Sequence, residues 1–114
     1  MAPDPRDLLP LKPLVFQILL ALSHGERHGW SLVKEIQEQD GGSRVLPANF
    51  YRTLRAMLSA GLVEESGRRR PAGDDERRRY FKLTALGEQA ARLEAGRLRD
   101  LMADVRMRRL LRKA

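Results

Sequence analysis

Between residues 13 and 61, hydrophobic positions recur at helical spacing in three short runs. The first run starts at Pro13 and ends at Ser23-His24-Gly25, and its apolar arc is wide enough to predict a nearly all-buried helix. The second covers residues 28–39, and the third starts at Pro47 and closes at Gly61. The stripe expected to face the core from the third helix consists of Phe50, Leu54, Met57 and Leu58.

Two short alternating segments, residues 62–65 and 80–83, predict a β-hairpin joined by a long basic loop. Thr84 then predicts the cap of a last helix that continues to about Arg112. Such a helix would be roughly 40 Å long, which is more than a globule of this size can cover. A second copy of the chain is the simplest partner that could bury the apolar side of this helix. The expected seam consists of Leu86, Ala90, Leu93, Leu98, Leu101, Met102 and Val105.

Three divisions of the chain follow from this pattern. Residues 1–12 hold Pro3, Pro5 and Pro10, which predict a flexible, extended N-terminal arm. Residues 13–83 form the expected winged-helix DNA-binding domain, and residues 84–114 the expected dimerisation helix. The fold class is therefore mainly α (α+β), a winged helix-turn-helix with a two-stranded wing and a long C-terminal helix.

The net charge of the chain limits the kinds of partner that it is expected to bind. The 114 residues carry 22 Lys and Arg against 15 Asp and Glu, a formal net charge of +7, which suits nucleic acid or an acidic membrane face. No apolar run approaches the roughly 18 residues of a membrane span, so we expect no membrane association of that kind. The lack of cysteine fits a reducing compartment, and the cytoplasm is the default expectation.

Catalytic and metal-binding patterns are weak. No Ser, His and Asp set stands at a recognisable spacing, and the phosphate-loop pattern is missing, so we expect neither an enzyme nor a cofactor. His24 and His28 are four residues apart, but Gly25 and Gly29 interrupt a shared helical face. We therefore expect no metal site.

Nucleic-acid contact is the chemistry that this element order favours, because the third helix of a winged helix enters the major groove. Its outward arc centres on Arg52, with Arg55 beside it, and the loop arginines could grip phosphates or a minor groove. Alternatively, Arg52 and Arg55 form a solvated face, and Asp74, Asp75 and Glu76 neutralise the loop. The loop arginines are Arg68, Arg69, Arg70, Arg77, Arg78 and Arg79.

Four segments in order resemble the signature of PadR-like transcriptional regulators. They are Phe16 to Leu22, His28-Gly29-Trp30, Phe50 to Leu54 followed by Gly61-Leu62-Val63, and Arg78 to Thr84 followed by Gly87. The resemblance runs from about Leu11 to the chain end, and the single short C-terminal helix resembles the smaller subgroup of the family.

The resemblance implies a dimeric winged-helix repressor that binds an inverted-repeat operator in double-stranded DNA and releases it on a small-molecule or other signal. Asn49, Tyr51, Arg52 and Arg55 would then lie on the recognition helix. His28, Gly29 and Trp30 would open a helix that braces the phosphate backbone, and the loop from Arg68 to Arg79 would be the wing. Leu46 stands where the family usually has a small capping residue, so the third helix should lack a strong side-chain cap.

Two other functions remain open on the sequence. The winged helix could contact a protein while the basic loop meets an acidic partner, or the arginine excess could serve non-sequence-specific binding of nucleic acid. The sequence identifies neither the operator, nor the regulated genes, nor any effector.

Overall fold

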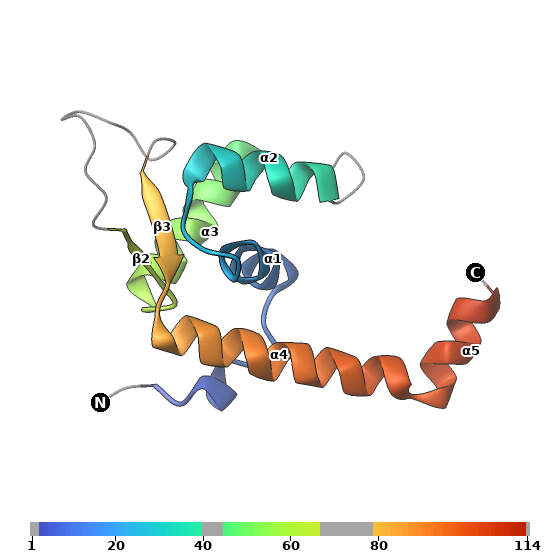
Figure 1. Cartoon of the computed structure of the whole chain (residues 1–114). Helices are drawn as coiled ribbons and strands as arrows, with labels where there is room; N and C mark the ends of the chain where they lie inside the picture. The colour runs from blue at the N-terminus through green and yellow to red at the C-terminus, as the bar shows by residue number, and fades with distance from the viewer. Residues whose placement is uncertain (1–2, 40–44, 67–78, 114) are drawn as a thin grey trace.

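The computed structural model describes residues 3–39, 45–66 and 79–113. In Figure 1, α1 lies at the centre, α2 and α4 lie on opposite sides of it, and the sheet closes one end. The elements in chain order are the 3-10 helix η1 (Pro5–Leu8), α1 (Pro13–Leu22), β1 (Arg27–His28), α2 (Gly29–Gln39), α3 (Pro47–Ser59), β2 (Val63–Glu65), β3 (Tyr80–Leu83), α4 (Ala85–Ala103) and α5 (Val105–Lys113).

The sheet is antiparallel and has the strand order β1-β3-β2. The predicted hairpin is present as β2 and β3, with Val63 opposite Leu83 and Glu65 opposite Phe81. A third strand was missed: Arg27 and His28 of β1 pair with the other edge of β3. Two residues are too few to show the alternation from which strands are recognised.

The core is formed where the predicted stripes of α1, α2 and α3 meet. Its largest fully buried side chains are Phe50, Phe81, Ile18, Leu19, Leu32, Ile36, Leu54, Met57, Val33 and Val63. The α3 stripe is confirmed, with Leu58 half-buried at its edge. The expectation that α1 is nearly all buried is wrong at Leu20, whose residue is 48% exposed.

The N-terminal segment departs from the expected extended arm. Pro5–Leu8 form a 3-10 helix that contacts α4, and Leu11 is buried in the core. Asp4 caps this helix, since its Oδ1 accepts the Arg6 N–H at 2.9 Å. Proline suits the first turn of such a helix, where its missing N–H costs nothing, so Pro5 starts local structure here.

A buried carboxylate ties this segment to α4. Glu94 is 2% exposed, and its Oε1 accepts the Leu11 N–H at 3.3 Å. Arg97 donates to both oxygens of Glu94, with Nε–Oε1 at 2.9 Å and Nη2–Oε2 at 2.7 Å. The hydrogen bonds from Arg97 lower the pKa of the Glu94 carboxyl. A single glutamate therefore satisfies a buried backbone donor and a guanidinium together.

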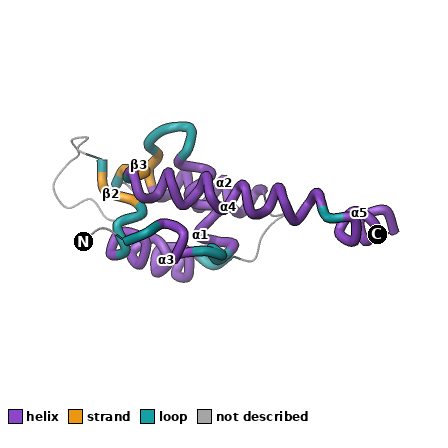
Figure 2. The backbone as a smooth tube through the Cα atoms, turned by 90° about the horizontal axis from the view of Figure 1, so that it is seen from below, coloured by secondary structure: helices purple, strands orange, loops and turns teal. Residues whose placement is uncertain are grey.

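The single long C-terminal helix is another corrected expectation, because the helix breaks at Asp104. Asp104 has an extended conformation, with ψ of 133°, and its Oδ1 accepts the Arg106 N–H at 2.7 Å. Aspartate favours this non-helical capping geometry, so it ends α4 and starts α5 in a new direction. Figure 2 shows the second half of α4 and all of α5 extending beyond the rest of the described chain.

The start of α4 sits against the backbone that precedes β2. The predicted cap is confirmed: Thr84 Oγ1 accepts the Gly87 N–H at 3.0 Å and donates to the Gly61 carbonyl. The Thr84 N–H donates to the Leu62 carbonyl at 3.2 Å. A Cβ on Gly87 would lie 2.0 Å from that same Leu62 oxygen, so only glycine fits there without a backbone shift.

Gly87→Ala should lower the free energy of unfolding by about 1–3 kcal/mol, because the Leu62 backbone has to move to admit the methyl group. Gly96→Ala on the same helix is the matched control, since its new Cβ would find Arg99 Nη2 at 3.7 Å, an ordinary contact. That control should be neutral or stabilising by up to about 1 kcal/mol. Urea unfolding measures both, and equal effects would contradict the close approach.

Glu94→Gln should lower stability by about 1–3 kcal/mol at pH 7, since the charged acceptor of Arg97 is lost. The lowered pKa means that the carboxylate stabilises the folded state above its unfolded value of about 4.3. That contribution disappears as pH falls through the folded pKa. The difference between wild type and variant should thus shrink below about pH 4. Glu88→Gln, at an exposed pair with Arg92, is the control and should cost under about 0.5 kcal/mol. A pH-independent loss for Glu94→Gln would refute the charge-based account.

Candidate nucleic-acid interface

Because one face of α3 is buried, only the side chains on its other faces are available to contact a partner. Phe50, Leu54 and Met57 hold the helix against α1, with 0–2% exposure. At 100° per residue, Arg52 and Arg55 must then point away from the core, and both are exposed. Asn49 is also exposed, so three of the four residues expected on the recognition helix share one open surface.

Arg52 is oriented by its neighbour one turn earlier. Its Nη1 donates to Asn49 Oδ1 at 3.1 Å, along the exposed surface of the helix. The asparagine amide is neutral, so this contact positions the guanidinium without cancelling its charge. α3 contains two arginines and no acidic residue, which leaves its outer face cationic.

Tyr51 has a different environment from the arginines. It is half-buried, and its ring meets the Phe50 ring edge-on, with centroids 5.1 Å apart and planes at 89°. This geometry favours a packing contribution at the flank of α3. The N-terminus of α3 also behaves as expected, because Leu46 makes no side-chain cap hydrogen bond.

His28 and Gly29 are engaged in the junction between the sheet and α2. The N–H of Ser31 donates to His28 Nδ1 at 3.3 Å, and the imidazole lies edge-on to Tyr80 with centroids 5.4 Å apart. The histidine ring thus caps the first turn of α2, as a side-chain acceptor does at a helix start. Gly29 is buried and donates its N–H to the Arg79 carbonyl at 3.0 Å.

Trp30 is the accessible member of the His28-Gly29-Trp30 segment, at 44% exposed. It stands at the start of α2, directly after the buried Gly29. The exposed indole of Trp30 is the group that this end of α2 can offer a partner.

The predicted wing is described only at its base. Arg68, Arg69, Arg70, Arg77 and Arg78 lie outside the described residues. Arg79 is half-buried, and its Nη1 lies 3.7 Å from Glu65 Oε2 on the neighbouring strand. Arg79 thus anchors the base of the hairpin, both through this ion pair and through the carbonyl that Gly29 contacts.

The expected seam of the C-terminal helix divides into two parts. Ala90 is completely covered by the chain's own core, so its assignment to a seam is corrected, and Leu86 is half-buried against that core. Leu98 is half-buried. The exposed part consists of Leu93, Leu101, Met102 and Val105, at 37%, 42%, 50% and 58% exposure.

Other kinds of site find little support in the described part of the chain. In residues 3–39, 45–66 and 79–113, no three His, Cys, Asp or Glu side chains gather as a metal site would require. Among the same residues, no helix combines the length and the apolar character that a membrane crossing needs.

Comparison with known proteins identifies the fold. The sequence matches the model of the transcriptional regulator PadR-like family over residues 18–93, which is more than half of the chain. No curated protein matches it significantly. A RosR complex, hsRosR-S4, is 27% identical with a TM-score of 0.70, covering 96% of this chain and 91% of that one.

RosR of H. salinarum is 26% identical, with a TM-score of 0.68 over 94% of this chain and 92% of that chain. Bacillus subtilis PadR, solved in complex with operator DNA, is 20% identical with a TM-score of 0.60, over 73% of this chain and 46% of that one. At that identity the likeness shows the fold alone. The architecture is the winged helix that the element order predicts, with a third strand added.

Proposed function

This chain belongs to the PadR-like family of transcriptional regulators, and on that premise we propose that it binds double-stranded DNA sequence-specifically through α3. The observation that carries the proposal is the outer face of α3, where Arg52, Asn49 and Arg55 are exposed on an acid-free helix fixed in rotation by its buried face. Residues 13–83 would be the DNA-binding domain.

Base recognition would rest on the paired Asn49 and Arg52. A guanidinium can donate two hydrogen bonds to the O6 and N7 of guanine, and an asparagine amide can do the same for adenine. Because Arg52 donates to Asn49 through Nη1, its remaining N–H groups stay available to a base edge. Each good bidentate contact contributes about 1–3 kcal/mol of discrimination.

Affinity would come mainly from phosphate contacts that carry no sequence information. The wing arginines, the first turn of α2 and Trp30 would serve this role. Binding should therefore weaken with salt, because each neutralised phosphate releases condensed counterions.

Repression would follow from a dimer. Residues 84–114 would dimerise the chain, which places two α3 helices roughly 34 Å apart, one turn of duplex, and gives a palindromic operator. A small-molecule or other signal that changes the angle between the copies would release the DNA. The exposed apolar side chains of α4 and α5 support this assignment.

Selection of duplexes from a random DNA pool identifies the operator, after which Arg52→Ala should weaken operator binding roughly 5- to 150-fold, corresponding to about 1–3 kcal/mol. Arg52→Lys sharpens the test, because lysine keeps the charge and loses the guanidinium fork. A base contact predicts that Arg52→Lys loses discrimination, and a phosphate contact predicts that it does not. Arg92→Ala on α4, also an exposed arginine, is the matched control.

Two results would remove the proposal. Failure to enrich any sequence, together with affinity that is independent of salt, would favour a winged helix that contacts protein. Equal affinity for the enriched and the random duplex would indicate nonspecific nucleic-acid binding.

A further inference from the structure

The two C-terminal helices differ in net charge. α4 carries three acidic and three basic residues, whereas α5 carries five basic residues and no acidic one. This nine-residue helix therefore accounts for most of the formal net charge of +7. The basic residues of α5 are Arg106, Arg108, Arg109, Arg112 and Lys113.

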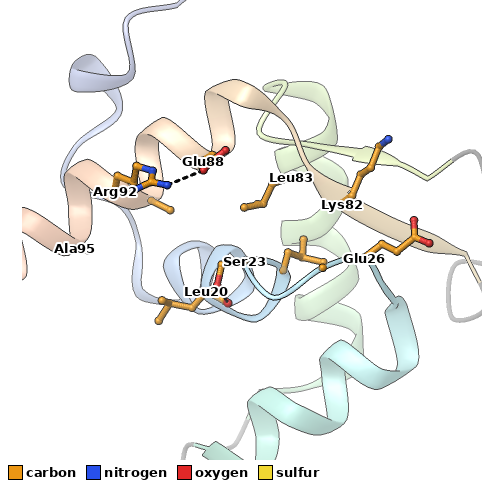
Figure 3. A pocket seen from close by; sticks show the side chains of 11 residues that line it. Leu20, Ser23, Glu26, Lys82, Leu83, Glu88, Arg92 and Ala95 are labelled. Atoms are coloured by element: carbon orange, nitrogen blue, oxygen red, sulfur yellow. Dashed lines mark hydrogen bonds and ion pairs between the residues drawn. The ribbon is translucent and has the colours of Figure 1, made fainter.

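The arginines of α4 have acidic partners within the chain. Arg92 donates to Glu88 at 2.9 Å, beside the pocket drawn in Figure 3. Arg97 and Arg99 each lie within 3.2 Å of a carboxylate oxygen as well. The positive charges of α4 are thus compensated locally.

The arginines of α5 are less completely paired. Arg106 donates to both carboxylate oxygens of Asp104, the residue that caps the helix. Arg108, Arg109 and Arg112 are exposed, and none of them forms an ion pair with another described residue. Three neighbouring guanidinium groups therefore remain open to an anionic partner.

The helix itself gains little from this cluster. Arg108 and Arg112 are four residues apart, so their like charges repel each other across one turn. Arg108 also lies in the first turn, at the positive end of the helix dipole, whereas only the last-turn Arg112 is placed favourably. Local stability does not explain the cluster, and the negative charge of a partner would relieve its repulsion.

The cluster occupies a side of α5 that is separate from its apolar side. At 100° per residue, the three arginines fall on an arc of about 100°, and Met107, Leu110 and Leu111 fall on another arc across the helix. Leu110 and Leu111 are 70% and 52% exposed. A partner that covers these leucines leaves the arginines accessible.

Duplex DNA is the anion that best fits the three arginines. A guanidinium fork donates two parallel hydrogen bonds to phosphate oxygens, and a duplex presents one negative charge per about 1.7 Å of its axis. Helices that lie on a membrane surface carry Trp or Phe on their apolar side, and α5 contains no aromatic residue. The chain also belongs to a family of transcriptional regulators.

The position of α5 separates it from α3. Figure 2 shows α3 beside the first half of α4 and α5 beyond the end of α4. In Figure 1, α5 turns back toward the side of α4 on which α1 and α2 lie. The 19 residues of α4 span roughly 28 Å, which is the length of about eight base pairs. α5 would therefore reach phosphates other than those beside α3.

We propose that Arg108, Arg109 and Arg112 bind the phosphate backbone of duplex DNA outside the base pairs that α3 of the same chain reads. This inference rests on the DNA binding of the proposed function. It adds a second surface, which raises affinity without adding sequence preference and lengthens the DNA that each chain covers.

Replacing these three arginines together by glutamine tests the contact, because glutamine favours a helix as arginine does and removes the charge. The matched control replaces three other exposed arginines by glutamine and lowers the net charge equally. These are Arg6, Arg92 and Arg99, each of which has an acidic partner. Affinity for the enriched duplex and for a random duplex of equal length is measured between about 50 and 200 mM salt.

The α5 variant should reduce the slope of log affinity against log salt by about two to three per chain, at about 0.9 for each lost phosphate contact. At the lower salt its affinity should fall at least about tenfold, by the same factor for both duplexes. An unchanged slope, an equal change in the control variant, or a loss confined to the enriched duplex would overturn the contact.

Two further measurements exclude other roles for the three arginines. Sedimentation of the α5 variant should match that of the wild type, and a loss of DNA binding that accompanies a loss of self-association would overturn the contact. Vesicles that contain phosphatidylglycerol test a lipid partner. Unchanged DNA binding with lost vesicle binding would overturn the contact and assign the arginines to a lipid surface.

Localised DNA cleavage measures the contact directly, because the sequence has no cysteine and an introduced thiol is unique. An iron–EDTA group attached to Arg109→Cys should cut the enriched duplex outside the base pairs that α3 protects. The same group on Arg6→Cys is the control and should cut little. Bound Arg109→Cys protein that cuts no DNA would overturn the contact.

The outcomes for α5 and α3 are distinguishable. If only the α5 contact fails, the chain still enriches a duplex and Arg52→Ala still weakens its binding. If sequence discrimination by α3 fails, the salt dependence of binding to the random duplex still reports on α5.

Discussion

The close contact between the first turn of α4 and the Leu62 backbone is the constraint on which the arrangement of the molecule depends. The Leu62 carbonyl accepts from Thr84 N–H and leaves no room for a Cβ on Gly87. α4 therefore leaves the winged domain in a fixed direction, set by backbone atoms that cannot relax as a flexible side chain would. In the proposed dimer, this direction of α4 would set the position of the partner and the spacing between the two recognition helices.

A second attachment, at Glu94, divides α4 into two functional halves. Up to Glu94 the helix belongs to the core, because Gly87, Ala90 and Glu94 are buried. From residue 95 to residue 112 no residue is buried. Since Glu94 also binds Leu11, the N-terminal segment and the anchored half of α4 form one unit. A force applied to the free half would be transmitted to α1 and, through it, to α3, which packs on α1.

The sequence predicted those elements whose buried residues recur at a regular spacing. Phe50, Leu54 and Met57 repeat as a helix requires, and the bounds of α3 and β3 followed closely. The predictions were wrong where a single polar contact determines the backbone conformation. Asp104 breaks the helix by capping, and Pro5 starts η1 where three prolines suggested an arm. Glu94 looks like a surface residue until Leu11, 83 positions away, is folded against it.

The candidate site residues fall into two groups: those that hold the fold together and those whose side chains are exposed to a partner. His28 caps α2 and Gly29 donates to Arg79, so this part of the family resemblance preserves the junction of sheet and helix. Arg52, Asn49 and Arg55 are exposed, and α3 keeps its position through its opposite face. Such residues can change without loss of the fold. A family of DNA-binding proteins can therefore keep one architecture while its members read different DNA, and in the function proposed for this chain the specificity would rest on these few exposed side chains.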